Sequence, residues 1–115
     1  MTKFPGQLFD LTELQSIAEG NDEFVSEMVT LFISETETAL PEIKTLIASG
    51  DFVRVKAMLH KMKPSIMVMG IHEAGELISF VQKMDLGSVH AAEIAGMFLK
   101  IEAILSEANE QLKRV

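Results

Sequence analysis

The segment DFVRVKAMLHKMKPSIMVMG, residues 51–70, decides the predicted fold. Its apolar residues recur at spacings of 3, 4, 3, 4 and 3, which form the stripe that a helix buries in a bundle. Asp51 precedes the stripe as a helix cap and Gly70 follows it as a turn, so we expect one helix between them. The stripe consists of Phe52, Val55, Leu59, Met62, Ile66 and Met69.

A short first helix is expected near the N-terminus. Asp10, with Glu13 three residues later, forms the residue pair that caps a helix start, and Gly20 marks the helix end. No stretch here or elsewhere alternates convincingly with period two, so no strand is expected.

A long second helix follows, capped by Asn21 or Asp22 and ended by Ser49-Gly50. Pro41 should kink or restart this helix, because proline lacks a backbone donor and crowds the preceding turn. The apolar residues expected on one side are Phe24, Met28, Leu31, Phe32, Ala39, Ile43, Leu46 and Ile47.

Two further helices complete the pattern after Gly70. The first reaches about Met84 and has on one face Ile71, Ala74, Ile78 and Val81. A turn at Asp85-Leu86-Gly87 and a cap at Ser88 precede the last helix, whose stripe is Ile94, Phe98, Ile101, Leu105, Ala108 and Leu112. Short connections make consecutive helices antiparallel. We therefore expect an all-α fold, an up-and-down antiparallel four-helix bundle with a short additional N-terminal helix.

The length of 115 residues and the apolar content of 48% fit a single domain over residues 1–115. No apolar run approaches the roughly 20 residues that span a bilayer, and the N-terminus lacks a secretory pattern. Without cysteine, the chain has neither a disulfide framework nor a thiolate metal site. We expect a cytoplasmic monomer that does not insert into a membrane.

The net charge of −7 argues against binding to nucleic acid or anionic lipid, which needs a basic surface. The charge is uneven, because residues 51–64 have a balance of +3 and leave −10 for the rest of the chain. Such a basic island can dock an acidic partner, although it can also be an ordinary solvated helix face. Its charged residues are Asp51, Arg54, Lys56, Lys61 and Lys63.

His60 lies on the outer face of the helix predicted from residues 51–70, about 130° from the centre of the buried stripe at 100° per residue. An exposed apolar stripe on this face would favour docking of a partner. The alternative is that the first helix or a loop covers it. The stripe consists of Val53, Ala57, Pro64, Met67 and Val68.

Lys56 and Lys63 lie one helical turn before and after His60 and are its neighbours on the helix surface. Their ammonium groups can neutralise the oxygens of a phosphoryl group that transfers to or from the imidazole. Pro64 removes the hydrogen bond to the carbonyl of His60. We expect a kinked but continuous helix here, the alternative being a helix that ends at Lys63.

Gln82 belongs to the next helix. His60 lies ten residues before Gly70, and Gln82 lies twelve after it. In an antiparallel hairpin these residues are about 15 and 18 Å from the turn and can be level with each other. Gln82 can then hold an imidazole nitrogen or a phosphoryl oxygen by hydrogen bond, the alternative being an ordinary surface glutamine.

These residues together resemble the histidine phosphotransfer (HPt) family. The matching pattern is His60-x-x-Lys63-x-Ser65, followed by Gly70 and Gln82, and the resemblance covers about residues 11–112. It implies a phosphoryl carrier rather than an enzyme with its own turnover. By this resemblance His60 is the phosphorylated nucleophile, Lys63 the stabilising cation and Gln82 the orienting partner.

The resemblance also implies the partner, which is a response-regulator receiver domain, alone or in a hybrid histidine kinase. An aspartate of the receiver donates the phosphoryl group or accepts it. No cofactor is expected on this chain, because the Mg²⁺ binds to the receiver. Many family members have glycine directly after the lysine, whereas this chain has Pro64, so its docking surface differs there. Lys56 and the apolar stripe form the expected binding surface.

Two other functions fit the same residues. A pure adaptor would dock through the Val53–Val68 stripe without phosphoryl chemistry. The phosphorylated domain of a chemotaxis-type kinase shares this bundle, but the chain, which we expect to be complete, has no Gly-rich nucleotide loop. His72 and His90 do not pair on a helix face at a metal-binding spacing, so no metal site is expected.

Overall fold

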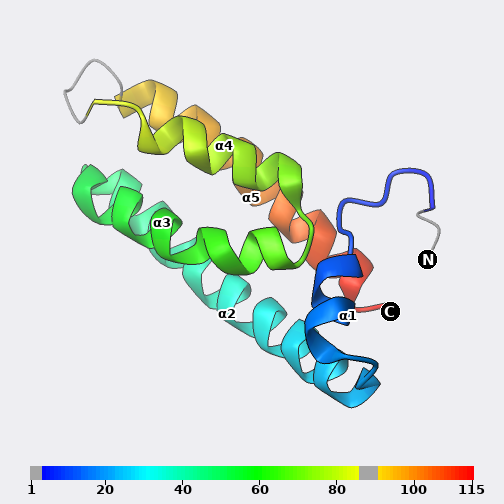
Figure 1. Cartoon of the computed structure of the whole chain (residues 1–115). Coiled ribbons are helices and arrows are strands. Elements are labelled where there is room, and N and C mark those ends of the chain that lie inside the picture. Colours follow the sequence, from blue (N-terminus) through cyan, green and yellow to red (C-terminus); the bar gives the residue numbers. More distant parts are fainter. Residues whose placement is uncertain (1–3, 86–90) are drawn as a thin grey trace.

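The computed structural model describes residues 4–85 and 91–115, and within these ranges every regular element is a helix (Figure 1). The predicted all-α class is therefore confirmed. The expected turn at Leu86-Gly87, the cap Ser88 and the side chain of His90 lie outside the described residues. Among the helices in the described ranges, none is long and apolar enough to cross a membrane. The helices are α1 (Thr12–Ala18), α2 (Asp22–Ala48), α3 (Phe52–Val68), α4 (His72–Gln82) and α5 (Ala91–Leu112).

The four longer helices pack in a ring. α2 contacts α3 and α5, and α4 also contacts α3 and α5. The short α1 packs on α2 and lies at one end of the elongated molecule (Figure 1). The longest extent of the molecule is 47 Å, close to the length of the 27-residue α2, which is about 40 Å at 1.5 Å per residue. The bundle is therefore about one long helix in length.

The core lies between the four longer helices, and the predicted stripes of α3, α4 and α5 supply much of it. Phe52 and Met62 of the α3 stripe are half-buried at its edge. Burying one large apolar side chain contributes about 1.5–3 kcal/mol, so these rows hold the bundle together. The buried stripe residues are Val55, Leu59 and Ile66 of α3, Met69 and Ile71 in the turn between α3 and α4, Ala74, Ile78 and Val81 of α4, and Ile94, Phe98, Ile101, Leu105, Ala108 and Leu112 of α5.

The prediction for α2 is wrong at two positions. Phe24 and Leu31 are 36% and 49% exposed, although the sequence pattern predicts both on the core side. At 100° per residue, Leu31 is turned well away from its buried neighbour Phe32, and so it leaves the contacts with the other helices. The buried row of α2 consists of Val29, Phe32, Thr36, Leu40 and Ile43.

Two helices begin at the caps that the sequence predicts. The side chain of Asn21 accepts the amide of Phe24 at 3.0 Å at the start of α2. Asp51 accepts the amide of Arg54 at 3.3 Å at the start of α3. Each cap satisfies one of the backbone donors that a helix start leaves without an intrahelical partner.

The predicted capping pair of the first helix is wrong. α1 begins at Thr12, and Asp10 lies one residue too early to cap it in the usual way. Its Oδ1 accepts the amide of Thr12 at 3.0 Å instead. The amide of Asp10 donates to the carbonyl of Met69, so Glu13 cannot accept it as a capping pair requires.

Both interior prolines lie inside continuous helices. α2 runs through Pro41 and α3 runs through Pro64. The alternatives in which one helix restarts at Pro41 and the other ends at Lys63 are therefore wrong. Each proline still removes a backbone donor, so the carbonyls of Glu37 and His60 lack their usual amide partner four residues on.

Gly70 turns the chain between α3 and α4 and touches the N-terminal segment. Its φ is +69°, in the left-handed region that favours glycine. A Cβ at this position would overlap the carbonyl oxygen of Asp10 and lie 2.6 Å from its amide nitrogen. The same Asp10 amide donates to the carbonyl of Met69 at 3.1 Å. This close approach holds the N-terminal segment on the α3–α4 turn.

Lys113 ties α2 to the residues at the end of α5. Its Nζ lies 3.1 Å from carboxylate oxygens of both Glu37 and Glu110. Hydrogen bonds to Glu37 and then to Glu110 raise the pKa of Lys113 above its ordinary value of 10.5.

Candidate functional site

The candidate site lies midway along α3, on the side turned away from the core. His60 is exposed, as its position on the helix predicts. Val53 is 65% exposed, and Ala57 and Pro64 are exposed as well. These three residues form a small apolar surface on the same face as the imidazole. The helix fixes their separations, because α3 is continuous over this stretch.

The apolar stripe is shorter than the sequence predicts. Met67 and Val68 are half-buried, and Val68 packs against the core. Gly75 of α4 accounts for Met67, since a Cβ at Gly75 would overlap the Met67 sulfur. The missing side chain at this helix contact lets Met67 pack onto α4. The exposed surface beside His60 therefore ends near Pro64.

Lys63 lies one turn after His60 and is half-buried. Within residues 4–85 and 91–115 its ammonium forms no ion pair. Helix side chains lean toward the N-terminus, so the side chain of Lys63 leans toward the turn that carries His60. An ammonium in this position can meet an anionic group bound to the imidazole.

The sequence predicts that the ammonium of Lys56 lies beside His60, but in the structure this ammonium is bonded elsewhere. Its Nζ donates to the carbonyl oxygen of Met84 at 2.7 Å, just beyond the end of α4. The last carbonyls of a helix lack amide partners and carry the negative end of the helix dipole, so a lysine there is favourable. Because the carbonyl of Met84 holds this ammonium, Lys56 cannot also neutralise a phosphoryl group without leaving it.

Gln82 reaches α3, but one turn earlier than predicted. Its Nε2 donates to the backbone carbonyl of Lys56 at 2.9 Å. In a regular α-helix that carbonyl also accepts the amide of His60. Gln82 thus contacts the backbone that carries His60, and among the residues that the structure describes it donates to this carbonyl and not to the imidazole. Two hydrogen bonds, Lys56 to Met84 and Gln82 to Lys56, therefore join α3 to α4 and to the residue that follows its C-cap.

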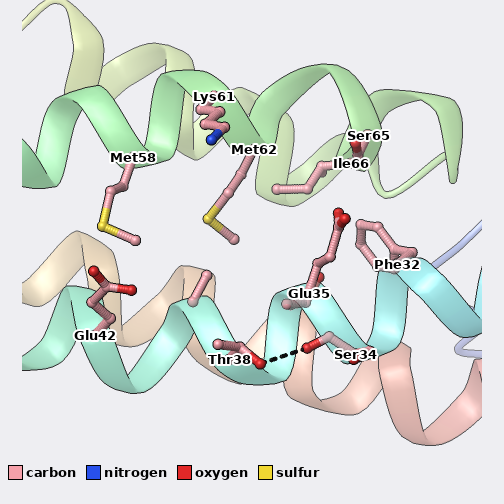
Figure 2. Close-up of a pocket in the computed structure, with 12 residues that line it drawn as sticks. Phe32, Ser34, Glu35, Thr38, Glu42, Met58, Lys61, Met62, Ser65 and Ile66 are labelled. Atoms are coloured by element: carbon pink, nitrogen blue, oxygen red, sulfur yellow. Dashed lines mark hydrogen bonds between the residues drawn. The ribbon is translucent and has the colours of Figure 1, made fainter.

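A groove between α2 and α3 adjoins the site, and the sequence analysis missed it. Its volume is about 670 Å³. Figure 2 shows Met58 and Met62 reaching from α3 toward α2, with Glu42 and Glu35 on the α2 side. Lys61, the residue after His60, also lines the groove. The four-residue spacing of the two methionines is the only available signal, and it indicates a shared face without showing that the face is left partly open.

In the part of the chain that the structure describes, no group of three or more His, Cys, Asp or Glu side chains comes together to hold an ion. His72 is exposed at the start of α4.

The comparisons with known proteins reveal no relative. No family model, no curated protein and no solved structure matches the chain. The interpretation of His60, Lys63 and Gln82 therefore depends on their spacing in the sequence and on the geometry described above.

Proposed function

We propose that this chain is a histidine-containing phosphotransfer protein of a multistep two-component phosphorelay. His60 accepts a phosphoryl group from an aspartate of a response-regulator receiver domain and passes it on. The observation that carries the proposal is an exposed histidine in the middle of a continuous helix, with Lys63 one turn away and without an ion pair in the described part of the chain.

The transfer is a displacement at phosphorus. A neutral ring nitrogen of His60 attacks in line and forms an N–P bond, while the P–O bond breaks and its electron pair leaves on the aspartate carboxylate. The proton on the other ring nitrogen can leave to solvent, because the imidazole is exposed. Since both phosphorylated residues are high-energy species, the step runs in either direction according to the partner concentrations.

Lys63 supports this step through its charge. Phosphoryl transfer depends mainly on positioning and on neutralising the negative oxygens of the transferring group. The Lys63 side chain leans toward His60, and no ion pair within the described residues has to break before it acts. The Mg²⁺ that the step needs belongs to the receiver in this proposal, so this chain binds no cofactor.

The charge around His60 suits the proposed partner. Residues 51–64 carry a balance of +3 on a chain whose net charge is −7. A phosphorylated aspartate is anionic, so this basic island attracts it and orients the encounter. The small exposed side chains of Val53, Ala57 and Pro64 leave room for a partner backbone to approach the imidazole.

An experiment with two separate readouts tests the proposal. A receiver domain is charged with acetyl phosphate and Mg²⁺, freed of the donor, and mixed with the wild type or with His60→Gln. Binding of the receiver and transfer of the phosphoryl group are measured independently. We expect the wild type to bind and to become phosphorylated, and His60→Gln to bind with similar affinity and to remain unmodified.

Two results would contradict the proposed phosphotransfer function. If both proteins bind the receiver and neither becomes phosphorylated, the chain is an adaptor that docks through the exposed surface around Val53, and the lysines are docking charges. If His60→Gln becomes phosphorylated as fast as the wild type, His60 is not the carrier.

A further inference from the structure

Lys56 is the residue through which the turn before His60 meets the end of α4. Its Nζ donates to the carbonyl oxygen of Met84 at 2.7 Å, and its own carbonyl accepts Nε2 of Gln82 at 2.9 Å. Lys56 takes part in the first bond through the mobile end of its side chain and in the second through its backbone carbonyl. Lys56 can therefore give up the first bond for another acceptor without moving the helix, while its backbone carbonyl keeps the second.

The imidazole of His60 lies close to Lys56 on the helix surface. Residues four apart in a helix have Cβ atoms about 5–6 Å apart. The His60 side chain leans toward the helix N-terminus and so covers the turn that begins at Lys56. The lysine stem is flexible and its ammonium has three donors, so it can turn from one acceptor to another.

A phosphoryl group on His60 is a stronger acceptor for Lys56 than the carbonyl of Met84. A protein phosphoryl group carries close to two negative charges and three acceptor oxygens, whereas the carbonyl is neutral. The Coulomb attraction of an ammonium for an anion a few ångströms away exceeds its attraction for a neutral dipole. Phosphorylation therefore draws Lys56 away from Met84.

We propose that Lys56 couples the phosphorylation state of His60 to the C-terminal end of α4. Its ammonium holds Met84 while His60 is unmodified and moves to the phosphoryl oxygens once His60 is modified. This inference rests on the proposed phosphotransfer function and adds to it a signal that a partner can detect. A partner that contacts the end of α4 then binds the two states with different affinities, and by linkage its binding changes the stability of the phosphohistidine.

The consequence is confined to a few residues. When Lys56 leaves, the carbonyl of Met84 loses its donor, and the negative end of the α4 dipole loses a nearby cation. The bonds that close this end run from the amide of Lys83 to Phe80 at 3.2 Å and from the amide of Met84 to Val81 at 3.1 Å. These bonds open more often once the lysine has left, whereas the Gln82 bond remains, because it uses the backbone of Lys56.

Hydrogen exchange of the whole chain tests the coupling, with phosphoramidate as the phosphoryl donor so that no partner is needed. The P–N bond of the donor breaks, an N–P bond forms at the imidazole, and ammonia leaves with the electron pair and takes up the proton that the imidazole releases. Intact mass at neutral pH gives the modified fraction. We expect the peptide over residues 80–85 to exchange about tenfold faster after modification, the factor that corresponds to about 1.4 kcal/mol for one hydrogen bond to a charged group.

Lys56→Met is the informative variant and Lys61→Met its matched control. Methionine keeps a long stem but lacks the ammonium, so unmodified Lys56→Met should already exchange over residues 80–85 as fast as the modified wild type. Modification should then add nothing further. Lys61 is on the groove side of α3, and its replacement should leave both states like the wild type. Unchanged exchange of the α5 peptides shows that each variant keeps its fold.

Two results overturn the coupling while leaving the proposed function intact. One is unchanged exchange over residues 80–85 in a wild type whose peptide masses show complete modification at His60. The other is acceleration in Lys56→Met equal to that in the wild type. A different result, equal labelling of His60→Gln and the wild type by a charged receiver domain, contradicts the proposed function and with it the coupling.

Discussion

Replacing Gly70 by alanine should destabilise the protein by about 3 kcal/mol. Gly70 has a φ of +69°, and a residue with a Cβ costs about 1–2 kcal/mol in this region. The new Cβ would also lie 2.6 Å from the amide nitrogen of Asp10, so the Asp10 backbone must move. Its hydrogen bond to Met69, worth about 0.5–1.5 kcal/mol, is then weakened. Phe9, now only 2% exposed, loses part of its burial with it.

Gly50→Ala is the matched control for this prediction. Gly50 has a similar φ of +76°, but a Cβ there meets nothing within 4 Å, so only the backbone cost applies. Urea unfolding of both variants, with linear extrapolation to water, gives the two losses in the free energy of unfolding. We expect Gly70→Ala to lose about 1 kcal/mol or more beyond Gly50→Ala. Equal losses would refute the idea that the contact with Asp10 is what requires glycine at this turn.

Three further outcomes are expected. Lys63→Ala should slow phosphoryl transfer from a phosphorylated receiver by about a hundredfold, because a cation beside the transferring group is lost. Lys61→Ala should slow the transfer much less. Equal slowing by the two variants would mean that only the overall charge of α3 matters. Gly75→Ala should push Met67 off α4 and speed its oxidation to the sulfoxide by peroxide, so an unchanged oxidation rate would contradict the packing of Met67 against Gly75. The raised pKa of Lys113 means that its ion pairs stabilise the fold fully below pH 10.5 and stop doing so as the pH rises through the raised value. In urea unfolding, the wild type should therefore remain more stable than Lys113→Met up to about pH 10.5. Loss of this difference in stability near neutral pH would contradict the assignment of the ion pairs.

Apolar spacing predicts α3, α4 and α5 well because each carries one dominant row of large side chains. The α2 pattern is ambiguous, since Leu31 and Phe32 are adjacent and only one of them can face the core. The buried row also includes Thr36, a polar residue that hydrophobic periodicity does not identify. Contact with the neighbouring helices decided between the two faces, and that contact cannot be deduced from α2 alone.

In the candidate site, too, the features that one helix determines could be predicted from the sequence, and those that depend on another helix could not. The exposure of His60 and Val53 follows from their angle on α3, which a single helix determines. The positions of Lys56 and Gln82 depend on partners 28 and 26 residues away in the chain, and the length of a side chain does not indicate which of several acceptors it meets. The burial of Met67 likewise follows from a glycine in another helix.

The most direct test of the proposed function is to identify the residue that is phosphorylated by a charged receiver. The wild type, His60→Gln and His72→Gln are each incubated with the receiver and then treated with acid or base. His72 is the matched control, because it is also exposed but lies at the start of α4, away from the lysines of α3. We expect a label that acid removes and base does not on the wild type and on His72→Gln, and no label on His60→Gln. Equal labelling of all three proteins would contradict the assignment of His60 as the phosphoryl carrier.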